Sequence, residues 1–152
     1  METLQFLILR ASMASKFGCW LIKRAESDLD GIVSYIAIDL ANPQAASDFV
    51  DKLQDNIEEA RVFPESGSLV DNEFLQLKNV RKKLIGNYIM YYLPNTVEKI
   101  IIILRIVYGK QNITEIHIKL DIWLRKHRSR VDRCFYLKIQ QLDSIVSFFT
   151  LL

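Results

Sequence analysis

The run of aliphatic residues from Ile100 to Leu104 limits most strongly how this chain can fold. Side chains alternate between the two faces of a strand, so a run that is apolar at every position predicts a central strand covered on both faces. The run is interrupted by Arg105 and falls far short of the roughly 20 apolar residues needed to cross a bilayer. We therefore expect no membrane span, and the chain must supply other elements that cover this strand.

Two helical patterns precede the strand and could cover it. Residues 25 to 40 have apolar side chains at three- and four-residue spacing, namely Leu29, Ile32, Val33, Ile36 and Leu40. Residues 43 to 61 repeat that spacing with Ala46, Phe49, Leu53, Ile57 and Ala60. Between them, Asn42 is a favourable N-cap residue and Pro43 suits the first helical position. The short connection predicts an antiparallel helical hairpin.

Strand-like segments flank this hairpin. Residues 17 to 23 form the first expected strand, and residues 75 to 85, 88 to 93 and 99 to 108 form an expected meander. Gly86-Asn87 supplies a two-residue hairpin turn, and Pro94-Asn95 opens the next turn. The predicted fold class is α+β, with an N-terminal strand and a helical hairpin packed on a three- to four-stranded antiparallel sheet.

The length of 152 residues suits a single domain that buries its own core. Cys19 and Cys134 have no metal-binding spacing with each other or with the two histidines, so we expect a reduced cytoplasmic protein without metal or cofactor. Residues 125 to 152 are first basic and then apolar, which predicts a helical or irregular C-terminal extension.

The net charge of +2 conceals a strong asymmetry along the chain. Residues 26 to 73 hold 12 acidic residues, against Lys52 and Arg61 as the only basic ones. The remainder of the chain holds 18 basic and 6 acidic residues. Such a division favours a polyanionic partner for the basic part. It is equally compatible with internal ion pairs between the two parts.

Six segments between about residues 20 and 120 also carry a family resemblance: Arg24 to Leu29, Tyr35-Ile36, Asn42 to Ala46, Phe63 to Glu65, Gly86 to Tyr92 and Ile103 to Lys110. In this order and spacing they resemble the RelE/ParE superfamily of type II toxin–antitoxin toxins, also called plasmid stabilisation proteins. The resemblance implies a growth-inhibiting protein that is neutralised by a cognate antitoxin. It is compatible with a homo-oligomer of the toxin and with a hetero-oligomer of toxin and antitoxin.

The resemblance leaves two mechanisms open. RelE-like members are endoribonucleases that cut messenger RNA on the ribosome, whereas ParE-like members inhibit DNA gyrase without catalysis. Ile89 and Gln111 stand where RelE-like nucleases usually have arginines, so the chain is more similar to the ParE-like members. An inactive regulatory relative is a third possibility.

The candidate residues differ between the mechanisms. Cleavage through the RNA 2′-hydroxyl needs a proton acceptor, a cation for the phosphorane charge and an acid for the leaving oxygen. By resemblance, the catalytic candidates are Lys83, Arg105, Lys110 and His117. For the binding mechanism, the expected surface comprises Arg81, Lys83, Tyr92, Arg105 and Lys110.

Arg105 has both a functional and a structural interpretation. Simple alternation places it on one strand face with Ile101, Ile103 and Val107, where it could clamp a phosphate. Alternatively, its stem is buried and its head pairs with a carboxylate such as Glu98.

Overall fold

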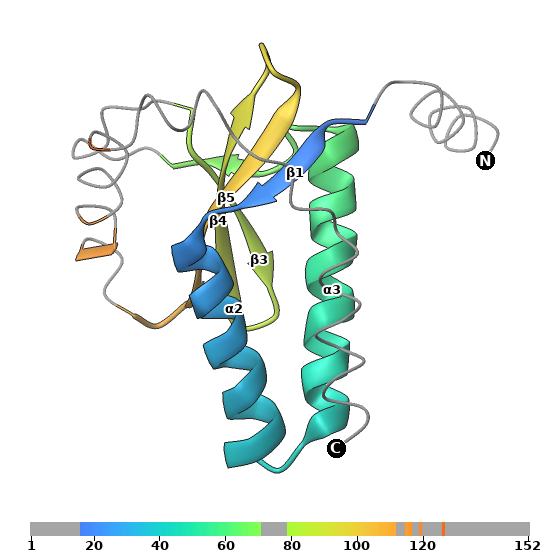
Figure 1. The fold of residues 1–152 in the computed structure, drawn as a ribbon, viewed down its shortest axis with the longest axis vertical. Helices are drawn as coiled ribbons and strands as arrows, with labels where there is room; N and C mark the ends of the chain where they lie inside the picture. The colour runs from blue at the N-terminus through green and yellow to red at the C-terminus, as the bar shows by residue number, and fades with distance from the viewer. Residues whose placement is uncertain (1–15, 71–78, 112–114, 117–118, 120–125, 127–152) are drawn as a thin grey trace, which may run out of the picture.

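The computed structural model describes residues 16–70, 79–111, 115–116, 119 and 126 (Figure 1). The elements in chain order are β1 (Gly18–Leu21), α2 (Lys23–Ser34), the π-helix η1 (Tyr35–Asp39), α3 (Pro43–Val62), β2 (Ser68–Leu69), β3 (Arg81–Ile85), β4 (Tyr88–Asn95) and β5 (Ile100–Tyr108). The predicted order of strand, helical hairpin and meander is confirmed. The expectations for His117, Cys134 and the extension at 125–152 fall outside the described residues, except for Lys126, which is exposed.

The strands form one mixed sheet in the order β1-β5-β4-β3-β2. β3, β4 and β5 make the expected antiparallel meander, and β2 adds two residues at its edge. β1 pairs with β5 in parallel, with Gly18 opposite Ile100 and Leu21 opposite Ile103. The four strands β2 to β5 form the predicted three- to four-stranded antiparallel sheet, and the N-terminal strand, whose pairing was left open, joins it in parallel. Residues 100 to 104 belong to a central strand, as expected.

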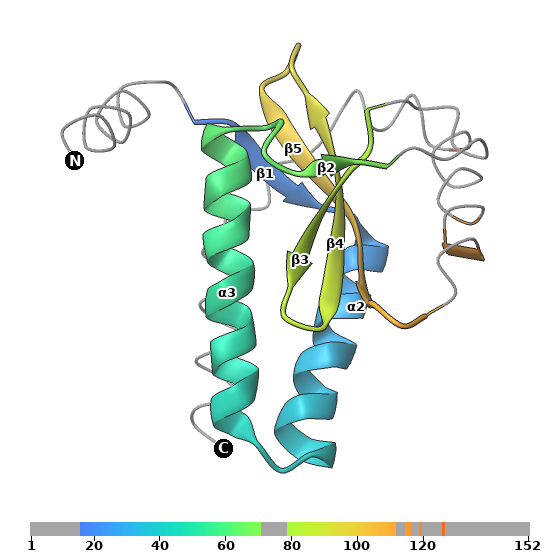
Figure 2. The same ribbon diagram turned by 180° about the vertical axis from the view of Figure 1, so that it is seen from behind.

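The two helices run antiparallel along one side of the sheet (Figures 1 and 2). Asn42 begins α3 as expected, because its side-chain oxygen accepts from the Ala45 N–H at 3.0 Å and Pro43 follows it. The predicted stripe of α3 is buried, and it comprises Ala46, Phe49, Leu53, Ile57 and Ala60. Among the described residues, no helix is long and apolar enough to cross a membrane.

The stripe of the first helix ends earlier than its spacing predicts. Leu29, Val33 and Ile36 are buried, but Leu40 is 55% exposed. The helix becomes π-helical at Tyr35, and the wider turn moves the following side chains out of phase with the core. Leu40 therefore lies at the surface, where the regular helical period would have buried it.

The two turns of the meander differ in how well the sequence predicted them. Gly86 and Asn87 form the β3–β4 turn, and Gly86 has a φ of 60°, which glycine adopts without strain. Pro94 and Asn95 still belong to β4, so the next turn begins one residue later than Asn95. The Asn95 side chain then accepts from the N–H groups of Val97 and Glu98.

Candidate functional site

Arg105 is held by an aspartate of helix α2. Its Nε donates to Asp28 Oδ2 at 2.7 Å and its Nη2 donates to Oδ1 at 3.3 Å. The two side chains are only 13% and 12% exposed. Glu98, the partner suggested by sequence, is exposed in the β4–β5 turn. Arg105 is thus engaged in a nearly buried ion pair, with Asp28 in the place expected for Glu98.

A bulge between β4 and β5 alters the face on which Arg105 lies. Tyr92 pairs with Ile103, whereas the preceding Tyr91 pairs with Arg105, so Leu104 is the extra residue. The alternation of side chains is therefore reset between Ile103 and Arg105. The prediction that these two residues share a face was wrong, because simple alternation does not anticipate a bulge.

Lys83 is engaged by the other helix. Its Nζ lies 2.5 Å from Glu59 Oε2 on α3, and the lysine side chain is only 7% exposed. The glutamate side chain is 56% exposed, so the pair reaches from the interior to the surface. Lys83 is therefore an inward-facing cation whose charge is balanced within the molecule.

Arg81 and Tyr92 tie the loop after α3 to the sheet. Arg81 Nη1 donates to the carbonyls of Glu65 and Gly67 at 2.9 and 2.8 Å. The Tyr92 hydroxyl donates to the Pro64 carbonyl at 2.9 Å and accepts from the Gly67 N–H at 2.8 Å. Tyr92 is fully buried, so it does not belong to a binding surface. A Cβ on Gly67 would lie 2.6 Å from that hydroxyl, which explains the glycine there.

Lys110 differs from the other candidate cations because it is exposed. It follows the last strand, and among the described residues it forms no ion pair. Gln111 beside it is exposed, whereas Ile89 is buried in β4. His117 lies outside the described residues. The structure therefore does not bring Lys83, Arg105 and Lys110 together as a set of free cations.

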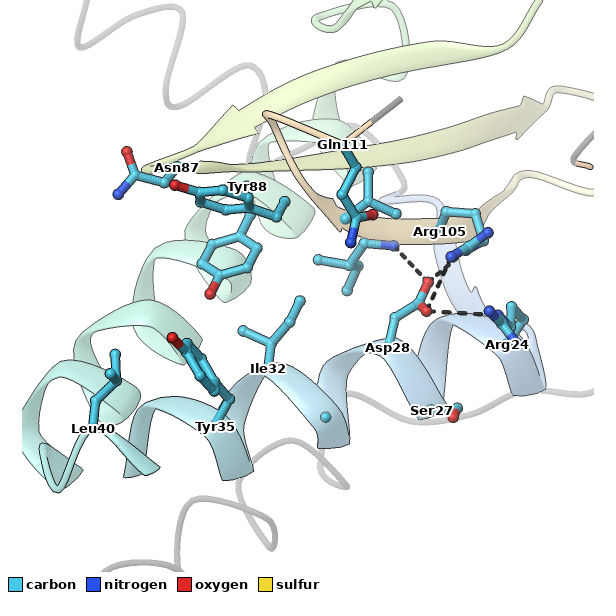
Figure 3. A pocket seen from close by; sticks show the side chains of 14 residues that line it. Arg24, Ser27, Asp28, Ile32, Tyr35, Leu40, Asn87, Tyr88, Arg105 and Gln111 are labelled. Atoms are coloured by element: carbon cyan, nitrogen blue, oxygen red, sulfur yellow. Dashed lines mark hydrogen bonds and ion pairs between the residues drawn. The ribbon is translucent and has the colours of Figure 1, made fainter. Parts of the chain in front are cut away.

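A groove of about 730 Å³ lies between α2 and the end of β5 (Figure 3). Asp28 lies at the charged end of the groove, between Arg105 and Arg24. The Arg24 Nε is 3.7 Å from Asp28 Oδ1. The other lining residues that matter here are aromatic or aliphatic, namely Ile32, Tyr35, Leu40, Tyr88 and Tyr108. Burial and the neighbouring Tyr35 and Tyr108 hydroxyls raise the pKa of Tyr88 above its usual range, so it stays a neutral phenol.

Sequence reasoning did not pair Asp28 with Arg105, and it assigned no role to Arg24, Tyr35 or Tyr108. A signal was present, because Asp28 lies one turn before Ile32 on the side of α2 that faces the sheet. An acidic residue beside a helical apolar stripe and an arginine in an apolar strand are natural partners. Their separation of 77 residues in sequence is what hid the pairing.

The other titratable groups of the described part of the chain form no metal site. Among the residues that the structure describes, no three His, Cys, Asp or Glu side chains are grouped closely enough to hold a metal ion. Burial raises the pKa of the Cys19 thiol to about 12, so it is a protonated core residue at neutral pH.

Comparison with protein families decides where the chain belongs. Residues 21–113 match the family described as the ParE toxin of the type II toxin–antitoxin system parDE. The chain belongs to the ParE toxin family. The matched residues run from Leu21, the last residue of β1, through both helices and the meander, and they include the groove. The RelE/ParE resemblance found in the sequence is therefore confirmed.

Solved structures extend this comparison at the level of the fold. The chromosomal ParDE toxin–antitoxin system of P. aeruginosa contains a chain that is 19% identical, with a TM-score of 0.50 over 64% of this chain and 100% of that chain. The RelBE2 toxin–antitoxin complex of Mycobacterium tuberculosis gives 15% identity and a TM-score of 0.44 over 61% and 98%. No curated protein sequence matches this ParE-family chain.

Proposed function

We propose that this ParE-family toxin inhibits growth by binding an essential target such as DNA gyrase, without cutting RNA. The observation that carries the proposal is the engagement of Lys83 by Glu59 and of Arg105 by Asp28. A nuclease needs cations that are free to meet the developing phosphorane charge. Here each of these cations would have to leave a carboxylate first, and that cost would be added to the reaction barrier.

The same contacts leave fewer of the candidate residues available for a binding surface. Arg81, Lys83, Tyr92 and Arg105 hold the loop and the helices against the sheet, so we assign them a supporting role. Lys110 is the candidate that is exposed and able to meet an anionic group of the target. Neutralisation by a cognate antitoxin is part of the proposal, and the toxin–antitoxin complexes among the solved structures support it.

The proposal is tested by giving the purified full-length chain to two reactions. One is DNA supercoiling by gyrase, and the other is translation of a messenger RNA in a cell extract, followed by mapping of the RNA ends. We expect inhibition of supercoiling and an intact messenger RNA. Lys110→Ala should weaken the inhibition several-fold, as loss of a surface charge does in an anion-binding interface.

Lys52→Ala is the matched control, because Lys52 is an exposed lysine on α3 away from the end of β5. It should leave the inhibition unchanged. Ribosome-dependent cleavage that is lost in Lys110→Ala and in His117→Ala would contradict the proposal and support the endoribonuclease alternative. Inactivity in both reactions would contradict it as well.

A further inference from the structure

Strand β3 presents two side chains on the face of the sheet that is turned away from the helices (Figure 2). Lys83 points toward α3, where it pairs with Glu59. Because side chains alternate along a strand, Lys82 and Leu84 point to the opposite face. Leu84 is 72% exposed there, and Lys82 is partly exposed. This second face therefore carries an exposed aliphatic side chain beside a lysine.

The edge of β3 at Leu84 is open to an approaching molecule. β2 pairs with β3 at Arg81 and Lys82 only, and the Val80 carbonyl accepts from the Val70 N–H on the same side at 2.9 Å. Among the described residues, no strand pairs with this edge at Leu84. A partner can therefore reach the Leu84 side chain without displacing a strand of the sheet.

A row of contacts leads across the sheet from Leu84 to Lys110. Leu84 pairs with Ile89 on β4, and a Cβ placed on Gly109 would lie 3.7 Å from the Ile89 side chain. The Gly109 N–H donates to the Asn87 carbonyl at 2.8 Å, which holds the chain just before Lys110 against the β3–β4 turn. Lys110 is exposed. The aliphatic residues of this row thus have a lysine beyond them on β5, as well as Lys82 beside them on β3.

These two lysines have no carboxylate partner within the described part of the chain. Neither Lys82 nor Lys110 forms an ion pair there. The carboxylates that pair with Lys83 and Arg105 come from the two helices, and none of the described strands contains an acidic residue. The internal pairing that balances the cations beside the helices therefore does not extend to the lysines of the second face.

We propose that Lys82, Leu84 and Lys110 form a lysine–leucine surface that docks the acidic surface of a protein partner. An apolar side chain of the partner would lie against Leu84, and carboxylates beside it would meet the two lysines. This inference rests on the proposed function, because the partner is the protein whose inhibition arrests growth and Lys110 belongs to both proposals. It adds Lys82 and Leu84, and it states the chemistry that the partner must present.

A protein surface suits these residues better than a nucleic acid does. Single-stranded nucleic acids are bound mainly by aromatic side chains on which the bases stack, together with cations. The lysine–leucine surface offers two cations but an aliphatic side chain between them. Phosphates would be attracted to the lysines, yet they would gain nothing from covering Leu84. Carboxylates beside an apolar side chain use all three residues.

The test is an amide NMR titration of the isotope-labelled full-length chain with a synthetic alanine-rich helical peptide. The peptide carries glutamate, leucine and glutamate at four-residue spacing, which places them on one face of its helix. We expect saturable shifts of the Lys82, Leu84 and Lys110 amides. The same peptide with lysines in place of the glutamates is the charge control and should produce no such shifts.

Two pairs of variants sharpen the test. Leu84→Ala should weaken peptide binding about tenfold, whereas Leu69→Ala, at a leucine of β2 that is 52% exposed, should leave it unchanged. Lys82→Ala should weaken binding several-fold, whereas Lys23→Ala, at an exposed lysine of α2, should not. Leu84 is largely exposed, so its truncation removes little from the core.

The outcomes separate the two proposals. Shifts with the acidic peptide that weaken in Leu84→Ala and Lys82→Ala support the lysine–leucine surface. Absence of shifts, equal binding of both peptides, or shifts produced only by a single-stranded RNA oligomer would overturn it. Gyrase supercoiling is measured in parallel with the same variants. Inhibition that persists unchanged in Leu84→Ala would overturn the docking surface alone, whereas peptide binding by a chain that does not inhibit gyrase would contradict the proposed function alone.

Discussion

Lys83 shows how a single residue can look functional in sequence and be structural in the fold. Its ammonium group is almost fully withdrawn from water, and burial of a charge without a partner is costly. The ion pair with Glu59 offsets the cost of burying the Lys83 ammonium group, although the Glu59 side chain is itself half-exposed. The two partners are therefore not equivalent, because only the lysine depends on the pair for its solvation.

This asymmetry predicts unequal effects of two substitutions. Glu59→Ala leaves the buried ammonium group of Lys83 without its carboxylate partner. It should lower the free energy of unfolding by about 1 to 3 kcal/mol. Lys83→Met keeps an apolar stem of similar length, and Glu59 can be hydrated, so its effect should stay within about 1 kcal/mol. Urea denaturation of the full chain measures both. Asp55→Ala, at an exposed position of α3, is the control; an equal loss in both variants would contradict the interpretation.

Cys19 gives a prediction about pH. Its thiol has a pKa of about 12 in the fold, against an ordinary value of 9.0, because it is buried. A thiol reagent should therefore label Cys19 slowly in the folded chain and rapidly after unfolding in urea. Because the unfolded chain loses this proton first, stability should fall as the pH rises from 9.0 toward 12.

The measurement uses a Cys134→Ser chain, so that a single thiol reports. Labelling rates are followed by absorbance at neutral pH, with and without urea. Rapid labelling of the folded chain at neutral pH would show that Cys19 is accessible and would refute its assignment to the core.

At the scale of elements, the loop between α3 and β2 depends on two sheet residues. Tyr92 and Arg81 supply hydrogen bonds to the backbone of residues 64 to 67. Tyr92→Phe removes the hydroxyl and leaves the Pro64 carbonyl and the Gly67 N–H without that partner. The expected loss of stability is about 1 to 3 kcal/mol.

The loss of stability in Tyr92→Phe should be accompanied by a local change in hydrogen exchange. Hydrogen exchange of the Gly67 amide should accelerate in Tyr92→Phe, while exchange within β4 and β5 should change only as much as global stability does. Tyr108→Phe, at a partly exposed position near the end of the same sheet, serves as the control for a lost hydroxyl. Unchanged exchange at Gly67 would mean that the hydroxyl does not hold this loop.

The elements also differ in how far the sequence predicted them. Helix α3 and the β3–β4 turn were predicted closely, because apolar spacing, Asn42-Pro43 and Gly86-Asn87 are local signals. The parallel pairing of β1, the π-helical turn and the bulge at Leu104 were not predicted. The π-helical turn and the bulge depart from the regular period of their elements, and the pairing of β1 joins distant segments, so the local spacing of side chains does not reveal them.

At the scale of the whole molecule, the charge asymmetry acquires a specific meaning. Asp28, Glu59 and Glu65, from the acidic segment, contact Arg105, Lys83 and Arg81, from the basic remainder. Of the two interpretations that charge alone left open, internal pairing therefore accounts for these three cations. Among the described candidate cations, Lys110 is the one that remains available to an external partner. This is the reason for proposing binding in preference to catalysis.

The site was harder to predict than the family for the same reason. Short local segments such as Gly86 to Tyr92 were enough to indicate the RelE/ParE superfamily, which the family match confirms. Which cations are free depends on contacts such as Arg105 with Asp28, across 77 residues. Residue type and position in a strand did not distinguish a free cation from a paired one.

The most direct test of this account is growth arrest after induced expression of Lys83→Met beside the unmodified chain, at equal levels of soluble protein. If Lys83 only balances Glu59, both chains should arrest growth to the same extent, and a cognate antitoxin should relieve both. If the unmodified chain arrests growth and Lys83→Met does not, Lys83 acts on the target or on RNA, and the account of internally paired cations is contradicted.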